Sequence, residues 1–131
     1  MMAGGHWIGH WSRTQGNIAL SSGEAELNAA VTACSEGRGL VNVAKEMGVS
    51  IKLEILGDSS ASLGICSRTG AGRVKHLEVK QLWVQEAVAL KKVRVYKSPR
   101  RLNFADSLTH HWSRPSGHSH FQGMGLEWLY Q

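Results

Sequence analysis

Several features that would assign the chain to a common protein class are missing from its 131 residues. No apolar run approaches the ~20 residues of a membrane helix, and the start, MMAGGHWIGHW, lacks the basic and apolar regions of a signal peptide. The two cysteines, Cys34 and Cys66, form no C-x-x-C pair, which favours buried, reduced thiols in an intracellular protein over a disulfide or a zinc site. A hydrophobic share of 42% then indicates a single globular domain.

Acidic residues are also scarce within residues 68–101. Glu78 and Glu86 are the only acids there, against ten Lys and Arg side chains, so the net charge of +5 is unevenly spread. Such a basic stretch suits a polyanionic ligand, because each neutralised phosphate releases condensed counterions. A solvated basic surface without a ligand explains the charge equally well. Charge therefore supports a nucleic-acid partner without establishing it.

The first half of the chain predicts a strand, a long helix and a second strand. Residues 6–12 favour a short strand, and Ser21 with Glu24 three positions later forms a capping box at which a helix begins. The helical pattern ends near Gly48, a suitable C-terminal cap. Residues 51–57 alternate apolar and polar side chains, the period of a strand.

The second half predicts further helices and one more strand. Residues 59–67 favour a short helix, residues 92–98 a strand and residues 103–112 a final helix. Residues 77–90 predict a helix whose apolar face consists of Val79, Leu82, Trp83, Ala87 and Leu90. Strands that alternate with helices favour an α/β fold, a sheet layered with helices.

Glu26 is the first of three acids that could form a divalent-metal site. It lies on a helix face continued by three small residues, Ala30, Ala33 and Gly37, which predicts close packing against a sheet. A charged group on such a face needs a partner, and a bound cation is one good partner. Gly37 and Gly39 each cost roughly 1 kcal/mol inside a helix, and a close contact between helix and sheet would explain both.

Asp58 and Asp106 are the other two acids. Asp58 is equally suited to cap the helix that follows it and to bind a ligand, because ligands gather at the carboxyl ends of strands in open α/β sheets. Asp106 lies early in the last predicted helix, where its charge favourably meets the helix dipole. Carboxylates from separate elements are what a two-metal phosphodiesterase site needs, since Mg²⁺ ions about 3.5–4 Å apart share oxygen ligands.

Four blocks of sequence, in the same order, resemble the ribonuclease H domain of Ty1/copia-type retrotransposon polyproteins. WSRTQGNIALSSGEAELNAA is similar to the family's W-S-x-x-Q strand end and its A-L-S-S-x-E-A-E helix. ILGDSSASL resembles the family's strand that ends in Asp-x-x-Ala/Ser, and VKHLEVKQLWVQEAV resembles its K-H-I-D/E…W/F-V-R-E helix. NFADSLTH is similar to its N-x-A-D-x-L-T-K segment. The resemblance covers roughly residues 10–110.

The resemblance implies a ribonuclease H-like fold, in which helices flank a mixed central sheet and acids gather at its centre. It also implies a two-metal site for Mg²⁺ or Mn²⁺ that cleaves the RNA strand of an RNA–DNA hybrid. One metal would activate a water and the other would stabilise the departing 3′ oxygen. By their match to the family's motifs, Glu26, Asp58 and Asp106 are the expected metal-binding and catalytic residues.

The basic stretch would then face the phosphates of the hybrid, which is read by its shape, backbone and 2′-OH groups. We expect the nucleic-acid-binding residues to include Arg73, Lys75, His76, Lys80, Arg100 and Arg101. An RNA–DNA hybrid or another nucleic acid is thus the expected partner, together with the reverse transcriptase region of the parent polyprotein. We expect no membrane contact and an intracellular location, in a cytoplasmic particle or the nucleus.

The chain departs from this family at its start. The family's first aspartate lies on a strand several tens of residues before the W-S-x-x-Q block, whereas about ten residues precede Trp11 and none is acidic. We therefore expect the first strand and most of the second to be missing, which removes a metal ligand and leaves neighbouring strands unpaired. Residues 1–112 are predicted to form a partial ribonuclease H-like domain that folds poorly or cleaves weakly, followed by a Gly/His-containing tail at 113–131.

Two other functions remain open. A catalytically dead remnant would keep the basic nucleic-acid-binding face without the metal site, and a structural domain would tether the neighbouring reverse transcriptase. The zinc hypothesis is the weaker one, because no structural zinc spacing is matched by Cys34 and Cys66 together with His110, His111, His118 and His120. Trp7, Trp11 and Trp83 are expected in the core rather than as platforms for stacked bases.

Overall fold

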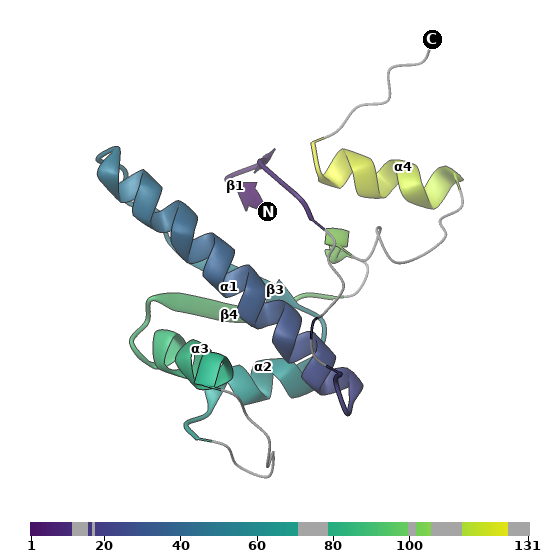
Figure 1. The fold of residues 1–131 in the computed structure, drawn as a ribbon. Coiled ribbons are helices and arrows are strands. Elements are labelled where there is room, and N and C mark those ends of the chain that lie inside the picture. The colour runs from purple at the N-terminus through teal and green to yellow at the C-terminus, as the bar shows by residue number, and fades with distance from the viewer. Residues whose placement is uncertain (12–15, 17, 71–78, 100–101, 106–113, 126–131) are drawn as a thin grey trace. The chain divides into compact units, whose positions relative to one another are not determined.

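The computed structural model of the chain describes residues 1–11, 16, 18–70, 79–99, 102–105 and 114–125. These residues belong to two compact units, one spanning Gln15–Lys97 and the other combining Met1–Thr14 with Ser98–Gln131. Figure 1 shows the helices and strands of both units. Four helices and two two-stranded sheets lie in the described ranges, so the chain is mixed α/β, the coarse class that the sequence predicts.

Helix α1 (Ser22–Glu46) begins at the predicted capping box. The Ser21 Oγ accepts the N–H of Glu24 at 3.2 Å. In return, the Glu24 Oε2 accepts the N–H of Leu20 at 2.9 Å. These two hydrogen bonds fix the chain as it enters the helix, because they satisfy N–H groups that have no partner within it. The predicted start of the helix is confirmed.

The other end of α1 is a Schellman motif. The N–H of Gly48 donates to the carbonyl of Lys45 at 3.0 Å, and the N–H of Val49 donates to that of Ala44 at 2.8 Å. Gly48 has a φ of 77°, a left-handed conformation that glycine adopts without the clash of a Cβ. The predicted cap at Gly48 is also confirmed.

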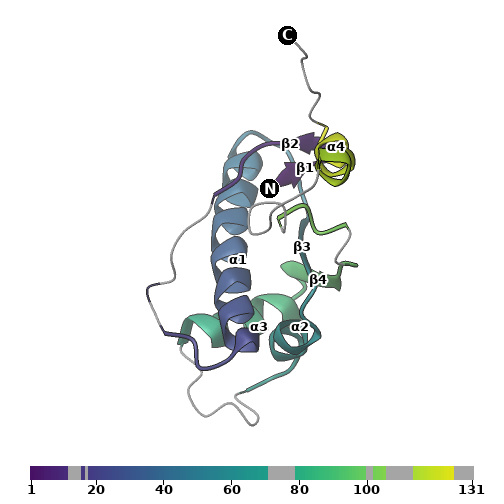
Figure 2. The same ribbon diagram turned by 90° about the vertical axis from the view of Figure 1, so that its right-hand side faces the viewer.

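Strands β3 (Leu53–Gly57) and β4 (Val93–Lys97) pair in parallel, with Leu53 opposite Val93 and Gly57 opposite Lys97. Both strands are predicted by their alternating side chains, although β3 starts at residue 53 rather than residue 51. Figure 2 shows α1 running along one side of this pair. The strand residues that pack with the helices are Leu53, Ile55, Val93 and Val95.

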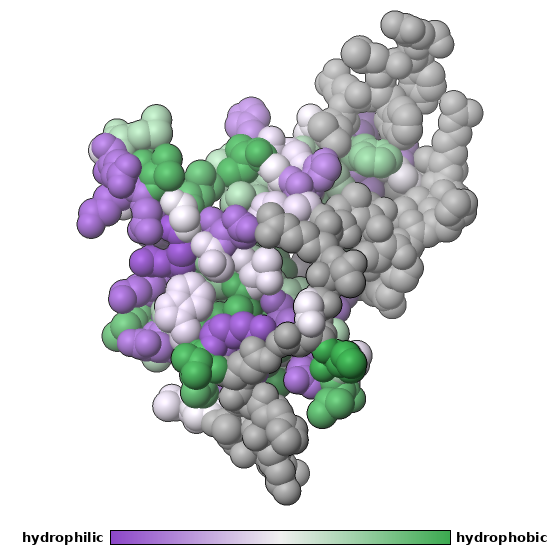
Figure 3. All heavy atoms as spheres, viewed as in Figure 1, coloured by the Kyte–Doolittle hydropathy of each residue, from purple (hydrophilic) through white to green (hydrophobic). Residues whose placement is uncertain are grey.

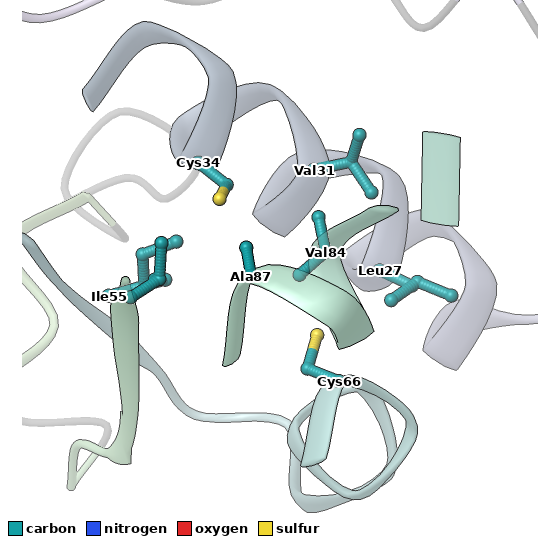
Figure 4. Packing of buried hydrophobic residues seen from close by; sticks show 8 residues of the cluster. Leu27, Val31, Cys34, Ile55, Cys66, Val84 and Ala87 are labelled. Carbon is teal, nitrogen blue, oxygen red and sulfur yellow. The ribbon is translucent and has the colours of Figure 1, made fainter. Parts of the chain in front are cut away.

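The core of the Gln15–Lys97 unit takes side chains from all of its elements. Figure 4 shows residues of α1, β3, α2 (Ser60–Ser67) and α3 (Val79–Ala89) gathered around Val84 and Ala87. Two free thiols lie in this cluster, as the sequence predicts. Its buried members are Leu27, Val31, Cys34, Ile55, Cys66, Val84, Ala87 and Val93.

The buried face of α3 differs from the predicted one. Val79 is 83% exposed, and Leu82 and Trp83 are exposed as well. The prediction that these residues form the inner face was therefore wrong, and Trp83 is not a core residue. The helix turns a partly polar face inward, consisting of Gln81, Val84, Gln85 and Ala87.

Hydrogen bonds explain why two glutamines are buried on α3. The Gln85 side chain donates to the carbonyl oxygens of Ile65 at 3.0 Å and Gly70 at 3.1 Å, and accepts the N–H of Gly70 at 2.8 Å. Gln81 Nε2 donates to Asn28 Oδ1 on α1 at 3.0 Å. A buried amide whose polar atoms are paired avoids the usual cost of desolvation. Counting apolar residues cannot detect such partners.

The predicted close contact between helix and sheet occurs at Gly37 and not at Gly39. A Cβ built on Gly37 would lie 2.5 Å from Leu53 Cδ1 on β3. At Gly39, which is exposed, a Cβ would meet no atom within 4 Å. The explanation proposed for both glycines was therefore wrong for Gly39.

The second unit begins with a small antiparallel hairpin of β1 (Met2–Ala3) and β2 (His6–Trp7). Within residues 6–11, the described part of the strand predicted at residues 6–12, the structure has a strand at the first two residues. Gly4, in the turn, has a φ of 60°, which favours glycine. Trp7 and Trp11 are half-buried, so the prediction that they are core residues holds in part.

Helix α4 (Arg114–Gly123) lies in the tail, where the sequence shows no period and predicts no helix. The Phe104 ring packs edge-on against the His120 ring, with centroids 5.5 Å apart. A Cβ on Gly123 would lie 2.5 Å from the Phe104 ring, so glycine makes room for it. Buried Met124 follows the helix. Tertiary packing thus favours a helix in a sequence of low helix propensity.

Candidate functional site

Asp58 lies at the carboxyl end of the parallel β3–β4 pair, directly after β3. The N-cap of α2 is Ser59, whose Oγ accepts the N–H of Ser62 at 3.3 Å. The alternative role of Asp58 as the cap of this helix is therefore wrong. Among the described residues, none forms a hydrogen bond or an ion pair with the half-buried Asp58 carboxylate. That carboxylate is free to take a ligand.

Glu26 lies one turn into α1 and is exposed. The first turn of α1 packs against the start of α2, because a Cβ on Gly23 would lie 3.4 Å from the Ala61 Cβ. Asp58 precedes α2 by two residues, so the start of α1 and the carboxyl end of β3 lie at the same end of the unit. The small residues that continue the Glu26 face, Ala30 and Ala33, pack against the core as predicted.

Lys97 lies at this same end of the sheet. It is opposite Gly57 in the parallel register, and its Nζ donates to Ser60 Oγ at 2.6 Å. The last residue of β4 is thereby joined to the first residue of α2. The ammonium group reaches across the carboxyl end of the sheet to the segment that begins with Asp58. A carboxylate and an ammonium group thus lie at the carboxyl end of the β3–β4 pair.

The other residues expected to bind nucleic acid are mostly beyond the described ranges. Lys80 is described and lies exposed in the first turn of α3. Asp106, the third expected metal ligand, lies outside the described residues. The same holds for Arg73, Lys75, His76, Arg100 and Arg101.

Glu26 and Asp58 do not by themselves make a metal site. Carboxylate oxygens such as those of Glu26 and Asp58 suit Mg²⁺ and Mn²⁺, which prefer hard oxygen ligands. Within the residues that the structure describes, no group of three or more His, Cys, Asp or Glu side chains lies where it could hold a metal ion. A complete two-metal site would need further ligands, and no catalytic step follows from these two acids alone.

Sequence reasoning missed Lys97 as a member of this group. Lys97 belongs to the basic stretch of residues 68–101 but is not among the expected nucleic-acid-binding residues. One signal indicates its position, since a lysine near the end of the strand predicted at residues 92–98 comes to the same edge as Asp58 if the strands are parallel. The parallel register supplies that condition.

Apolar side chains are also exposed on the outer face of the sheet. Leu56 is 64% exposed and lies opposite Tyr96, which is 43% exposed. Beside them, Arg94 Nη1 and Glu54 Oε1 lie 3.9 Å apart, an ion pair open to solvent on both sides. Figure 3, viewed from the same side as Figure 1, shows polar and apolar side chains interspersed on the surface of the described residues. Among the described residues, one face of the β3–β4 pair packs with the helices, and the other exposes Leu56 and Tyr96.

Comparison of the chain with protein-family models, curated proteins and solved structures found no match. The resemblance to the retrotransposon ribonuclease H family therefore rests on the four sequence blocks. None of the helices in the described ranges combines the length and the apolar character that crossing a bilayer requires.

Proposed function

We propose that the chain is part of a ribonuclease H-type domain of a Ty1/copia-type retrotransposon polyprotein. Its intact form would cleave the RNA strand of RNA–DNA hybrids with Mg²⁺ or Mn²⁺. One observation carries the proposal: the start of α1 and the carboxyl end of β3 lie at one end of the Gln15–Lys97 unit. Those two elements bear Glu26 and Asp58, the acids that match the family's motifs. Carboxylates from separate elements at such an edge suit a phosphodiesterase site.

The basic character of the same unit supports a polyanionic substrate. Lys80 and Lys97 are both exposed. A duplex recognised by its backbone, as an RNA–DNA hybrid is, needs such cations and no base-specific groups. The reverse transcriptase region of the parent polyprotein is the proposed protein partner, with a location in a cytoplasmic particle or the nucleus.

The β3–β4 pair supports the view that the catalytic sheet is larger than the two strands described. Parallel strands usually lie in sheets covered on both faces, and an isolated pair is marginally stable. Exposed Leu56 and Tyr96 leave one face of this pair uncovered. We propose that a further strand, bearing the aspartate that the resemblance requires, completes both the sheet and the metal site. The chain alone should then bind hybrid and cleave it weakly.

A catalytically dead, nucleic-acid-binding remnant is the second candidate. It is favoured by the lack, among the described residues, of a trio of metal-ligating side chains. The two candidates make different predictions for Asp58. A domain that keeps part of its metal site should bind Mn²⁺ through this carboxylate, whereas a remnant should bind nucleic acid without any contribution from it.

The test uses the whole chain with a labelled RNA–DNA hybrid and with Mn²⁺. For the first candidate, we expect Asp58→Asn to abolish any metal-dependent cleavage of the RNA strand and to weaken Mn²⁺ binding, while hybrid binding persists. Glu54→Gln is the matched control, because Glu54 lies on β3, the strand that Asp58 follows, and belongs to a surface ion pair. Equal Mn²⁺ binding by wild type and Asp58→Asn would favour the remnant. A wild-type chain with no affinity for the hybrid would refute both candidates.

A further inference from the structure

Lys97 forms no ion pair with any of the described residues. Arg94, on the same strand, is paired with Glu54. In contrast, no described carboxylate lies within ion-pair distance of Lys97, whose hydrogen bond goes to the neutral Ser60 hydroxyl. A lysine ammonium has three N–H donors, and Ser60 uses one of them. The exposed ammonium group keeps the other donors for an external acceptor.

Two neighbouring residues, Gly57 and Ser60, influence where this ammonium group lies. The opposite residue in the register, Gly57, has no side chain that could displace it. The 2.6 Å hydrogen bond to Ser60 Oγ directs the flexible lysine chain toward the segment that starts at Asp58. An anchored lysine loses less conformational entropy on binding than a free one. The site therefore combines a held cation with a carboxylate at the same edge.

We infer that Lys97 binds a backbone phosphate of the nucleic acid next to Asp58, and that Ser60 positions its ammonium group. The inference rests on the proposed function and adds a residue to its substrate-binding face. An ammonium group binds phosphate oxygens as a point charge through short, charge-assisted hydrogen bonds. Such a contact would hold the strand at the edge where Asp58 lies.

The experiment measures binding of a fluorescently labelled RNA–DNA hybrid to the whole chain in EDTA, over a series of salt concentrations. Removing one phosphate contact should reduce the slope of log K against log salt by about 0.9, which is about an eightfold loss of affinity at 0.1 M salt. We expect this result for Lys97→Met. Lys97→Arg, which keeps the charge, should retain most of the affinity.

Lys92→Met is the matched control. Lys92 is exposed and immediately precedes β4, so the variant removes the same charge at the opposite end of that strand. It should change the slope less than Lys97→Met does. Ser60→Ala should weaken binding in the wild-type background and have no effect in the Lys97→Met background, because the hydroxyl acts through the ammonium group.

The outcomes separate this inference from the proposed function. If wild type binds the hybrid and Lys97→Met binds it equally well, or no worse than Lys92→Met, Lys97 is not a phosphate ligand and the proposed function stands. If wild type does not bind the hybrid at any salt concentration, both the inference and the proposed function are wrong. Far-UV circular dichroism of each variant checks that the substitution leaves the fold intact.

Discussion

Gln85 holds Gly70 by both of its backbone polar groups. The side-chain amide of Gln85 accepts the Gly70 N–H at 2.8 Å and donates to the Gly70 carbonyl at 3.1 Å. A third hydrogen bond, to the carbonyl of Ile65 at 3.0 Å, ties the same amide to α2. One buried side chain of α3 thus ties together Ile65 of α2 and Gly70, which follows that helix.

We predict that Gln85→Met lowers the free energy of unfolding by about 3 kcal/mol, because it leaves buried backbone groups without partners. Methionine has a similar length, so the loss reports hydrogen bonding rather than a cavity. Urea denaturation followed by circular dichroism measures it. Gln81→Met is the comparison, and its loss should be smaller because the Gln81 Nε2 donates to the side chain of Asn28, which can turn toward another partner, rather than to the backbone. Equal losses would contradict this account of Gln85.

The two glycines of α1 should respond in opposite directions to alanine. Gly37→Ala should destabilise the protein by about 1–2 kcal/mol, because the new Cβ overlaps the Leu53 side chain. Gly39→Ala should stabilise it by about 0.5–1 kcal/mol, since it meets open space and favours the helix. Thermal unfolding of both variants measures the difference. In a Leu53→Ala background, Gly37→Ala should no longer destabilise, and a persisting loss would show that the overlap is not the cause.

The cap of α2 and the candidate ligand beside it can be separated by two substitutions. Ser59→Ala should cost about 1 kcal/mol of stability, because it removes the acceptor for the Ser62 N–H. Asp58→Asn should cost less than about 0.5 kcal/mol, since the carboxylate does not cap the helix and only its favourable interaction with the helix dipole is lost. Chemical denaturation of both variants provides the measurement. A larger loss for Asp58→Asn would mean that Asp58 is mainly structural.

The buried thiols should make the protein less stable in alkali. Burial raises the pKa of Cys34 to about 11, with a smaller contribution from Cys66, and burial also raises the pKa of Cys66. The native thiols therefore keep their protons at a pH where unfolded thiols, with a pKa near 9.0, have lost them. The unfolded state then binds fewer protons, so stability falls as the pH rises from 9 toward 11, by at most about 1.4 kcal/mol per pH unit for each thiol.

This alkaline loss is measured by urea denaturation between pH 8 and pH 11. The Cys34→Ala/Cys66→Ala variant is the control, and its stability should fall less steeply over the same range. A thiol reagent should react with neither cysteine at pH 8 until denaturant is added, because both side chains are buried. Rapid reaction of the native protein would contradict the burial on which this prediction depends.

Local sequence patterns predict much of the secondary structure of the Gln15–Lys97 unit. The capping box at Ser21 and the glycine at position 48 predict both ends of α1, because the capping bonds are made within a few residues. The patterns in residues 51–57 and 92–98 likewise predict both strands, which the structure places at Leu53–Gly57 and Val93–Lys97. The orientation of α3 could not be predicted, since its buried Gln81 and Gln85 depend on partners 53 and 15 to 20 residues away.

The sequence predicts only part of the candidate site, because the rest depends on contacts that local pattern does not show. Sequence motifs point to Glu26 and Asp58. The sequence does not show whether Asp58 or its neighbour Ser59 caps α2, and the structure shows that Ser59 does. Lys97 enters the site only through the parallel register, which sequence pattern does not fix. Helix α4 was missed because contacts with Phe104, rather than propensity, favour it.

The parallel pairing of β3 and β4 also sets the order in which the chain can fold. Partners such as Leu53 and Val93 are 40 positions apart, so the loop between them must close before any of their hydrogen bonds form. The ends of α1 need only neighbours a few residues away. Pulse-labelled hydrogen exchange should therefore show protection in α1 before β3, and β3 should gain it together with β4. During synthesis, β3 cannot complete its pairing with β4 until residue 97 has left the ribosome.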